Sequence, residues 1–342
     1  MASTIQIRIL GLGNPLLDIS AVVPESFLKE YDLTLNNAIL AEEKHAPIYQ
    51  RLIDEFKASF IPGGATQNSM RVAQWLLEPG STGFMGSIGS DSYGKILKEC
   101  AEKAGVKVHY MIDANNPTGT CGVLIHKNER SLVTNLAAAN SFKISHLGTS
   151  EAIEMIDSAN IYYMSGFFIT VSVDSMIHVA KEATKNHKLL AINLSAPFLV
   201  DFFTEQLESV LYYTDYLFGN ESEAEAFGKK FALGNDVGEI ALAIASRPKS
   251  SGKLPRIVVF TQGSESTIVA CEGKLMKFPV PVLEKSLLID TNGAGDAFVG
   301  GFLAGLAKGK SVEKCVEVGH WAARQIIQTS GCVFPKECEF NL

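Results

Sequence analysis

The segment Asp290-Thr-Asn-Gly-Ala-Gly-Asp296 has the clearest chemical meaning in this chain. Gly293 and Gly295 allow a sharp backbone turn, and the uncharged run 297–307 behind them is long enough for a buried helix. Several N–H groups should therefore converge at a helix N-terminus, where a phosphoryl group binds. An acid at Asp296 would repel a static phosphate, so we interpret it as a proton acceptor for an attacking hydroxyl. The alternative is that Asp296 only caps the helix.

Two other segments carry side chains that suit a sugar. Gly63 and Gly64 permit close approach of backbone to a ligand, and Asn68 offers both a donor and an acceptor to hydroxyl groups. Asn14 and Asp18 directly follow an expected strand, where an Asp can accept hydroxyl protons from a ribose. A plain helix start at the first segment and a turn at the second are the competing interpretations.

Five more residues, in three segments, are candidates for phosphate or metal contacts. Asn220 and Glu223 follow a strand with the spacing of a helix start and could hold Mg²⁺ through its waters, or simply form a helix cap. Thr261 and Gly263 end another strand and either contact a nucleotide or begin a hairpin. His320 lies in an apolar helical stretch, where a lone histidine is more often part of the core than a ligand.

Two motif-like segments are rejected. The run 11–16 begins like a dinucleotide fingerprint, but it lacks the third glycine and Pro15 would interrupt the helix, so nicotinamide binding is excluded. The run 305–311 resembles a Walker A loop that is one residue short and follows a helix instead of a strand, so it is interpreted as a helix end.

The composition narrows the class of protein. The 342 residues are 46% hydrophobic with a formal net charge of −7, which is typical of a globular protein and offers no basic field for nucleic acid or anionic lipid. The six cysteines form no Cys-x-x-Cys pair, and no uncharged run reaches the length of a membrane helix. We expect a cytoplasmic monomer without nucleic-acid or membrane partners.

Strand-like and helix-like runs alternate along most of the chain. Ile5, Ile7 and Ile9 form an alternating strand that should stop at Gly11. From about Ser141 onward, helix-like runs such as 237–245 separate further strands, which we place at 161–164, 189–194, 216–218 and 257–261. This alternation predicts an α/β fold with a large, doubly wound, mostly parallel sheet flanked by helices.

Two segments break this rhythm and predict a smaller, strand-rich lid domain. Paired strands are expected at 118–125 and 131–136 around the polar turn 126–130, without a crossover helix between them. We predict that the lid segments 16–62 and 117–140 cover the carboxyl ends of the main sheet. The large nucleotide-binding and catalytic domain would then comprise 1–15, 63–116 and 141–342.

In combination, these motifs resemble the ribokinase-like family of sugar and nucleoside kinases along nearly the whole chain. The family's order is followed by Gly63-Gly64-x-x-x-Asn68, Asn220-x-x-Glu223, Thr261-x-Gly263 and Asp290-Thr-x-Gly-Ala-Gly-Asp296. Within the family the chain is similar to the eukaryotic adenosine kinases. The strings that carry this similarity include Gly13-Asn-Pro-Leu-Leu-Asp-Ile-Ser20, Pro117-Thr-Gly-Thr-Cys121, Arg130-Ser-Leu132, Gly166-Phe-Phe168 and Asn193-Leu-Ser-Ala-Pro-Phe198.

The resemblance implies a purine-salvage reaction, the transfer of the ATP γ-phosphoryl group to the 5′-hydroxyl of adenosine to give AMP and ADP. It gives Asp296 the role of base and Arg130 that of a lid cation that meets the transferring phosphoryl group. The anion hole is implied to comprise the N–H groups of Gly293, Ala294 and Gly295. Ribose contacts are implied for Asn14, Asp18, Gly63, Gly64 and Asn68, and the nucleoside pocket for Leu16, Leu40, Cys121, Leu132 and Phe168. Donor ATP is implied at Asn292, Thr261, Gly263 and His320, and Mg²⁺ near Asn220 and Glu223.

Two departures from the adenosine kinases fall near the expected purine site. Ala38 stands where those enzymes carry a Gln, and Ala65 stands where they often carry a Ser. Acceptance of inosine or guanosine therefore stays open, as does support of the anion hole by K⁺. The competing hypotheses are a kinase of another nucleoside or a sugar, and a nucleoside-binding protein that has lost catalysis. The intact Asp296 and Arg130 argue against the second.

Overall fold

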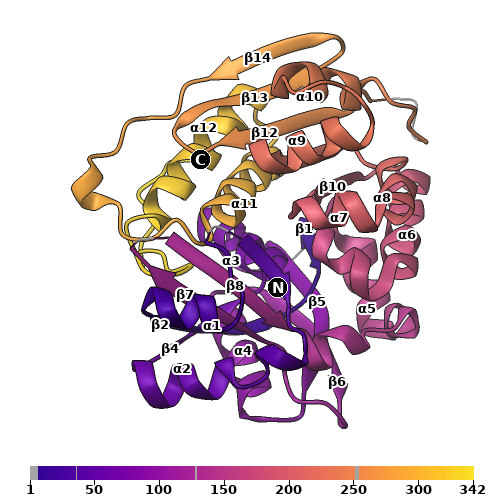
Figure 1. The fold of residues 1–342 in the computed structure, drawn as a ribbon. Coiled ribbons are helices and arrows are strands. Elements are labelled where there is room, and N and C mark those ends of the chain that lie inside the picture. The colour runs from indigo at the N-terminus through magenta and orange to yellow at the C-terminus, as the bar shows by residue number, and fades with distance from the viewer. Residues whose placement is uncertain (1–6, 36, 128, 251–253) are drawn as a thin grey trace.

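The computed structural model describes residues 7–35, 37–127, 129–250 and 254–342 (Figure 1). Ile5 of the expected N-terminal strand and Asn128 of the expected lid turn lie outside these residues, as do residues 1–6 of the predicted large domain.

A large mixed sheet forms the centre of the molecule. In the described part of the chain it has nine strands in the order β14-β13-β12-β11-β10-β9-β1-β5-β6, and only the pairs β12/β13 and β13/β14 are antiparallel. The strands are β1 (Ile9–Leu12), β5 (Thr82–Gly89), β6 (Lys107–Asp113), β9 (Ile161–Ser165), β10 (Leu189–Asn193), β11 (Tyr216–Asn220), β12 (Ile257–Gln262), β13 (Glu265–Cys271) and β14 (Lys274–Phe278). The expected strands of the C-terminal half are confirmed, whereas β1 runs through Gly11 instead of stopping there.

Helices cover both faces of this sheet because its central strands are apolar on both sides. Every residue of β9 is buried, and its side chains alternate between two separate hydrophobic clusters. One face is covered by α5 (Ser150–Ser158), α6 (Ile169–Lys185), α8 (Thr204–Leu211), α9 (Glu221–Lys230) and α10 (Val237–Ala245), with α7 (Pro197–Phe202) packed against α8 and α9. The other is covered by α3 (Ala65–Leu76), α4 (Ser92–Lys103), α11 (Ala294–Ala307) and α12 (Val312–Ile326). The predicted α/β fold is confirmed.

The second, smaller sheet is built from two separated stretches of the chain. Its order is β3-β8-β7-β2-β4, with β2 (Leu16–Val22), β3 (Asn37–Leu40), β4 (Ser59–Gly63), β7 (Thr120–His126) and β8 (Glu129–Asn135). The expected antiparallel pair is present as β7 and β8. Two helices, α1 (Glu25–Glu30) and α2 (Ile48–Phe56), pack on one side of the sheet through an apolar cluster of their own (Figure 1). The division of the chain into two domains at the expected bounds stays a prediction.

The strand order of the large sheet places a crevice next to β1. Chain connections run outward from β1 in both directions, to β5 and β6 on one side and to β9 and β10 on the other. Such a switch point opens a crevice at the carboxyl ends of the strands, which is where open α/β sheets bind ligands. The segments behind β1 and β9 begin there, at Gly13 and Gly166.

Candidate active site

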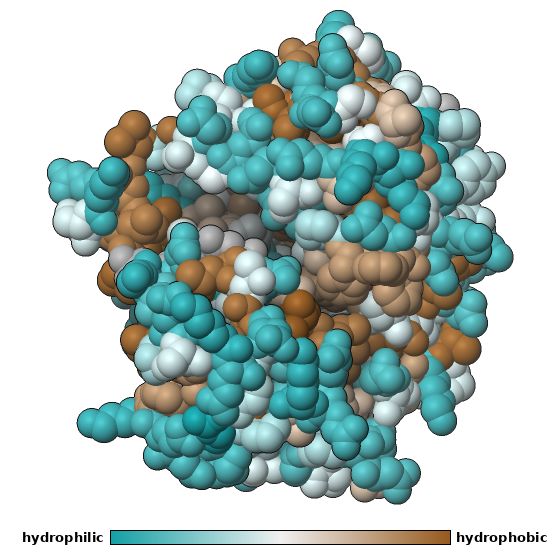
Figure 2. Space-filling model, viewed as in Figure 1, coloured by the Kyte–Doolittle hydropathy of each residue, from teal (hydrophilic) through white to brown (hydrophobic). Residues whose placement is uncertain are grey.

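A cavity of about 330 Å³ lies between the carboxyl end of the large sheet and the small sheet. Figure 2 shows the surface hollowed between these two parts of the molecule. The cavity brings together most of the predicted site residues from segments far apart in the chain: Asn14, Leu16, Asp18, Leu40, Gly64, Asn68, Cys121, Leu132, Asn220, Glu223, Thr261, Asn292, Gly293, Gly295 and Asp296. Ala38 and Ala65 line it as well.

At one end of the cavity, helix α11 begins at Ala294. Its capping residue is Gly293, whose φ of +78° is a conformation that a residue with a side chain adopts only under strain. Asp296 lies in the first turn and does not cap the helix, so the helix-cap alternative is wrong. The N–H of Ala294 donates to the carbonyl of Thr291 (3.2 Å), which engages one of the three expected anion-hole donors.

The carboxyl group of Asp296 is held by Asn68. The Asn68 Nδ2 donates to Asp296 Oδ2 over 3.0 Å, from helix α3 to helix α11. Burial raises the pKa of Asp296 to about 7, although the Asn68 hydrogen bond favours the ionised form. A carboxyl group with a pKa near neutrality can take up a proton and release it again, which is what a general base requires.

Beside Asp296, acceptor oxygens of three side chains surround the cavity. Asn14 Oδ1 and Asn68 Oδ1 are buried and have no hydrogen-bond partner among the described residues. Burial, with a smaller contribution from the charge of Asp296, raises the pKa of Asp18 to about 8. Because an unpartnered buried acceptor is costly, these oxygens are suited to the hydroxyl groups of a ligand.

The two glycines before helix α3 allow this close packing. Gly64 has a φ of +94°, and a Cβ there would collide with the carbonyl oxygen of Asn14. A Cβ at Gly63 would collide with the carboxyl group of Asp18. The glycine pair is therefore needed for the backbone to pass between the two predicted sugar-binding side chains.

The small sheet supplies a mainly apolar wall. Leu16 and Cys121 form a cluster on its cavity side, packed against Leu132, and Leu40 comes from the edge strand β3. Burial raises the pKa of the Cys121 thiol, which keeps it neutral. A wall of this kind suits the flat, weakly polar face of an aromatic base.

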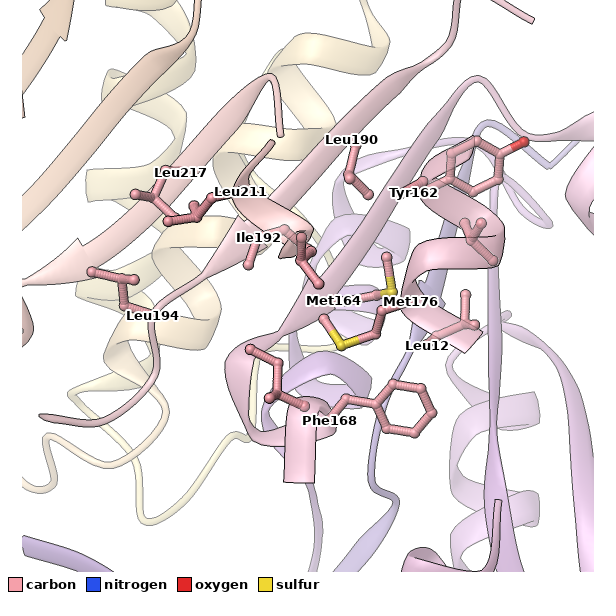
Figure 3. Close-up of a cluster of buried hydrophobic side chains, with 14 of the residues drawn as sticks. Leu12, Tyr162, Met164, Phe168, Met176, Leu190, Ile192, Leu194, Leu211 and Leu217 are labelled. Atoms are coloured by element: carbon pink, nitrogen blue, oxygen red, sulfur yellow. The ribbon is translucent and has the colours of Figure 1, made fainter. Parts of the chain in front are cut away.

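Phe168 does not line the cavity. It is fully buried in the core of the large sheet, packed against Phe142 with ring centroids 5.4 Å apart, and Figure 3 shows it among the core side chains. Its neighbour Phe167 lines the cavity instead. Both belong to the short 3₁₀ turn Gly166–Phe168, and successive residues of such a turn point in different directions.

Asn220 and Glu223 form the helix cap that the sequence left as an alternative, and they also line the cavity. Asn220 Oδ1 accepts from the Glu223 N–H (2.9 Å), while Glu223 Oε2 accepts from the Asn220 N–H (3.0 Å). Burial raises the pKa of Glu223 to about 7. The two roles are compatible, since the capping pair still faces the cavity.

Of the three residues expected around a nucleotide donor on β12 and α12, only Thr261 lines the cavity. Gly263 lies in the turn between β12 and β13 with a φ of +56°, which is the hairpin alternative. His320 is buried in α12, with its Nε2 hydrogen-bonded to Thr267 Oγ1 over 2.8 Å. Burial lowers its pKa, as in a neutral core histidine.

Arg130 is not among the cavity residues either. Its Nε lies 2.5 Å from Asp290 Oδ1, and both side chains are buried. Asp290 also accepts the N–H of Asn292 (2.6 Å) and the N–H of Gly331 (2.8 Å). The first aspartate of the Asp290–Asp296 segment therefore joins strand β8 to the loop before helix α11, a role that the sequence analysis did not assign.

The sequence analysis missed other cavity residues, among them Thr134, Phe167, Thr170, Asn193, Ser195 and Phe198. Four of them belong to the strings 166–168 and 193–198 that carried the resemblance, so the sequence drew attention to these segments without assigning a role to the four residues.

Among the described residues, no group of three or more His, Cys, Asp or Glu side chains could hold a metal ion. None of the described helices combines the length and apolar character needed to cross a membrane.

The fold is that of the ribokinase-like sugar and nucleoside kinases. The chain belongs to the pfkB family of carbohydrate kinases, which it matches over residues 27–338. Adenosine kinase 2 of Arabidopsis thaliana is 50% identical over 335 residues, covering 97% of each chain. The structure of Anopheles gambiae adenosine kinase in complex with P1,P4-di(adenosine-5) tetraphosphate has a TM-score of 0.95 and 50% identity, covering 97% of this chain and 98% of that chain. Adenosine kinase from Schistosoma mansoni, in complex with 2-fluoroadenosine, has a TM-score of 0.94 and 35% identity over the same shares.

Proposed function

We propose that this protein is an adenosine kinase, which transfers the γ-phosphoryl group of ATP to the 5′-hydroxyl of adenosine and releases AMP and ADP. The observation that carries the proposal is the cavity itself. A buried carboxyl group at a helix N-terminus and unpartnered acceptors suited to a ribose face the same space. The adenosine kinases that resemble the chain over nearly its full length support the same reaction.

In this reaction Asp296 acts as the base. The 5′-hydroxyl loses its proton to the Asp296 carboxylate as its oxygen attacks the γ-phosphorus, and the bond from phosphorus to the bridging oxygen of ADP breaks. The N–H groups at Gly293, Ala294 and Gly295 surround the phosphoryl oxygens. For Ala294 this requires exchange of its present bond to Thr291.

The acceptor lies between the two sheets. Asn14, Asp18 and Asn68 bind the ribose hydroxyls, and Gly63 and Gly64 leave room for them. The purine packs on the apolar wall of the small sheet, with the aromatic contact coming from Phe167 and not from Phe168. The wall residues are Leu16, Leu40, Cys121 and Leu132.

The donor lies toward β12 and the start of α11. Thr261 and Asn292 contact ATP directly, whereas Gly263 and His320 shape the hairpin and helix behind it. Arg130 meets the transferring phosphoryl group when it leaves Asp290, its partner in this structure.

Mg²⁺ fits this site as an ion held mainly through water. One buried carboxyl group and one amide oxygen, from Glu223 and Asn220, line the cavity, but both take part in the helix cap. Mg²⁺ retains several waters and is commonly bound by one or two carboxylates together with substrate phosphates. When bound, the ion would offset the negative charge of those phosphates. A role for K⁺ stays a prediction, tested by turnover in potassium against choline salts.

A coupled ADP-release assay tests the function. The purified protein is given ATP and one of five acceptors, namely adenosine, inosine, guanosine, ribose or fructose, and AMP is identified by mass spectrometry. We expect adenosine to give the highest kcat/KM, and the same preparation of Asp296→Asn controls for contaminating kinases. Faster turnover of ribose or fructose would overturn the proposal. Turnover of inosine would reveal relaxed base selectivity at Ala38 and Ala65.

The cytoplasmic location stays a prediction, which cell fractionation would test.

A further inference from the structure

Strand β9 carries two consecutive buried tyrosines with different surroundings. Tyr162 points into the cluster beneath α5 and α6, where Figure 3 shows it, and its hydroxyl donates to the carbonyl of Ile156 (2.7 Å). Tyr163 points to the opposite face and is also fully buried. Within the part of the chain that the structure describes, its hydroxyl has no hydrogen-bond partner at normal distance, although the side chains of Ser69 and Asn193 lie near enough to interact with it.

The surroundings of the Tyr163 hydroxyl lead directly to the proposed catalytic groups. The side chains of Ser69 and Asn193 face it, and the nearby charge of Asp296 disfavours its ionisation. Ser69 Oγ lies 2.9 Å from the backbone carbonyl of Asp296, to which it can donate. Asn193 Oδ1 accepts the N–H of Ser195 (2.9 Å), and both residues line the cavity.

Burying the Tyr163 hydroxyl without a close hydrogen-bond partner lowers the stability of the folded protein, which is unexpected for a residue that only fills the core. An unpartnered buried hydroxyl costs about 1–3 kcal/mol relative to an apolar group of the same shape. Phenylalanine already fills neighbouring positions of the same cluster, as Phe84, Phe218 and Phe302. The oxygen of Tyr163 therefore needs a reason beyond packing.

We propose that Tyr163 is a positioning residue for phosphoryl transfer. Its hydroxyl bridges Ser69 and Asn193 during the reaction, and it thereby fixes the first turn of α11 against the loop behind β10. This inference rests on the proposed function. Tyr163 is not among the residues that line the cavity, whereas Asn193 is, so Tyr163 acts on the site through its neighbours.

The hydroxyl also affects the proton affinity of the base. The titratable groups around Asp296 are Asp18 from β2, Tyr163 from β9 and Cys332 from the C-terminal segment, while Asn68 from α3 donates to it. Among these, the neutral Tyr163 hydroxyl adds a dipole that can orient toward a negative charge. Removing it leaves Asp296 in less polar surroundings, so the pKa of Asp296 rises and the base is protonated more at any given pH.

The test compares Tyr163→Phe with Tyr162→Phe, which each remove one oxygen from adjacent buried positions. For Tyr163→Phe we expect kcat with adenosine and ATP to fall about three- to tenfold at pH 6.5, with the acid limb of the kcat profile moved to higher pH by about 0.5–1 unit. The KM for adenosine should change less than about twofold, since the acceptor contacts remain. Its midpoint of thermal unfolding should equal or exceed that of the parent, because the hydroxyl has no hydrogen bond of normal length in this structure.

Tyr162→Phe should show the reverse behaviour. It loses the bond to Ile156, so its unfolding midpoint falls, while its pH profile matches that of the parent. Ser69→Ala should move the acid limb in the same direction as Tyr163→Phe, and the double variant should move it less than the sum of both. A Tyr163→Phe enzyme with the kcat and pH profile of an active parent overturns the inference and leaves the function intact. A parent that does not phosphorylate adenosine overturns both.

Discussion

The two sheets that meet at the cavity differ in what they contribute to it. The large sheet and its helices provide a helix N-terminus, the buried carboxyl group of Asp296 and the capping pair at Asn220. The small sheet provides mainly apolar side chains, with Asp18 as its acid. Helices cover both faces of the large sheet, whereas α1 and α2 cover one face of the small sheet and its other face borders the cavity.

This difference indicates a division of labour under the proposed function. Charge develops during phosphoryl transfer, and preorganised dipoles stabilise it best where packing prevents them from reorienting. Recognition of a flat base needs mainly apolar area, which a sheet with one open face supplies. Substitutions in the large sheet should therefore affect kcat first, and substitutions in the small sheet should affect KM first.

The largest effect is expected from Asp296→Asn. Loss of a general base typically costs about 10²–10⁴-fold in rate, so kcat should fall by that factor while adenosine affinity stays near the parent's. Steady-state kinetics and calorimetric titration with adenosine measure the two quantities separately. Turnover close to that of the parent would remove Asp296 from the role of base.

Arg130→Ala sharpens the comparison because Arg130 is a charged residue of the small sheet. We expect kcat to fall about 10²-fold with a smaller change in KM, since a cation acts mainly as charge moves to the phosphoryl oxygens. The unfolding midpoint should fall too, because Asp290 loses its buried partner. Arg51→Ala, at a partly exposed arginine of α2, is the matched control. A loss of stability with unchanged kcat would make Arg130 a structural anchor only.

Leu132→Ala tests the apolar wall. Losing most of this partly buried leucine side chain removes about 1–2 kcal/mol of contact with the base, so the KM for adenosine should rise about tenfold while kcat changes less. Val22→Ala, at an exposed end of β2 in the same sheet, should leave KM unchanged. If kcat fell while KM stayed the same, the proposed division between the sheets would be wrong.

The smallest effect concerns stability against pH. Because the pKa of Asp296 is about 7 in the folded protein and 3.8 is its ordinary value, the folded state holds the proton more tightly. That contribution to stability is complete below about pH 4 and is lost as the pH rises through about 7. The Asp296→Asn variant has no carboxyl group to ionise at this position, so its stability does not fall in this way. At pH 8 the variant should therefore be more stable than the parent by about 1–3 kcal/mol. Urea unfolding at pH 5 and pH 8 measures the difference, and an equal difference at both pH values would contradict the buried, protonated state.

Much of the site could be predicted where the sequence acts locally. Gly293 and the apolar run behind it favour a helix start through local interactions, so α11 and the position of Asp296 near its N-terminus could be predicted from neighbouring residues. The cap at Asn220 and Glu223 has the same local origin. The pair Gly63 and Gly64 indicated a close approach, although the groups that come close, on Asn14 and Asp18, were known only as separate candidates.

The remaining features depend on contacts between distant segments. Phe167 and Phe168 are the same residue type in one turn, and only the packing around Phe142 decides which of them faces the core. Arg130 is 160 positions from Asp290, and no local pattern joins them. His320 and Thr267 likewise form their hydrogen bond only because α12 and β13 meet in the folded protein.

The sequence by itself determined the α/β class, the paired strands β7 and β8 of the small sheet and the helix start behind Gly293, because periodicity, glycine conformation and capping act over a few residues. Only the tertiary structure decided which of two adjacent tyrosines on β9 lies beneath the cavity. It also decided the raised pKa of Asp296 and the burial of Asp290 against Arg130. The physical reason is that burial, and the electrostatic effects that depend on it, are properties of the packed assembly of segments and are absent from any one of them.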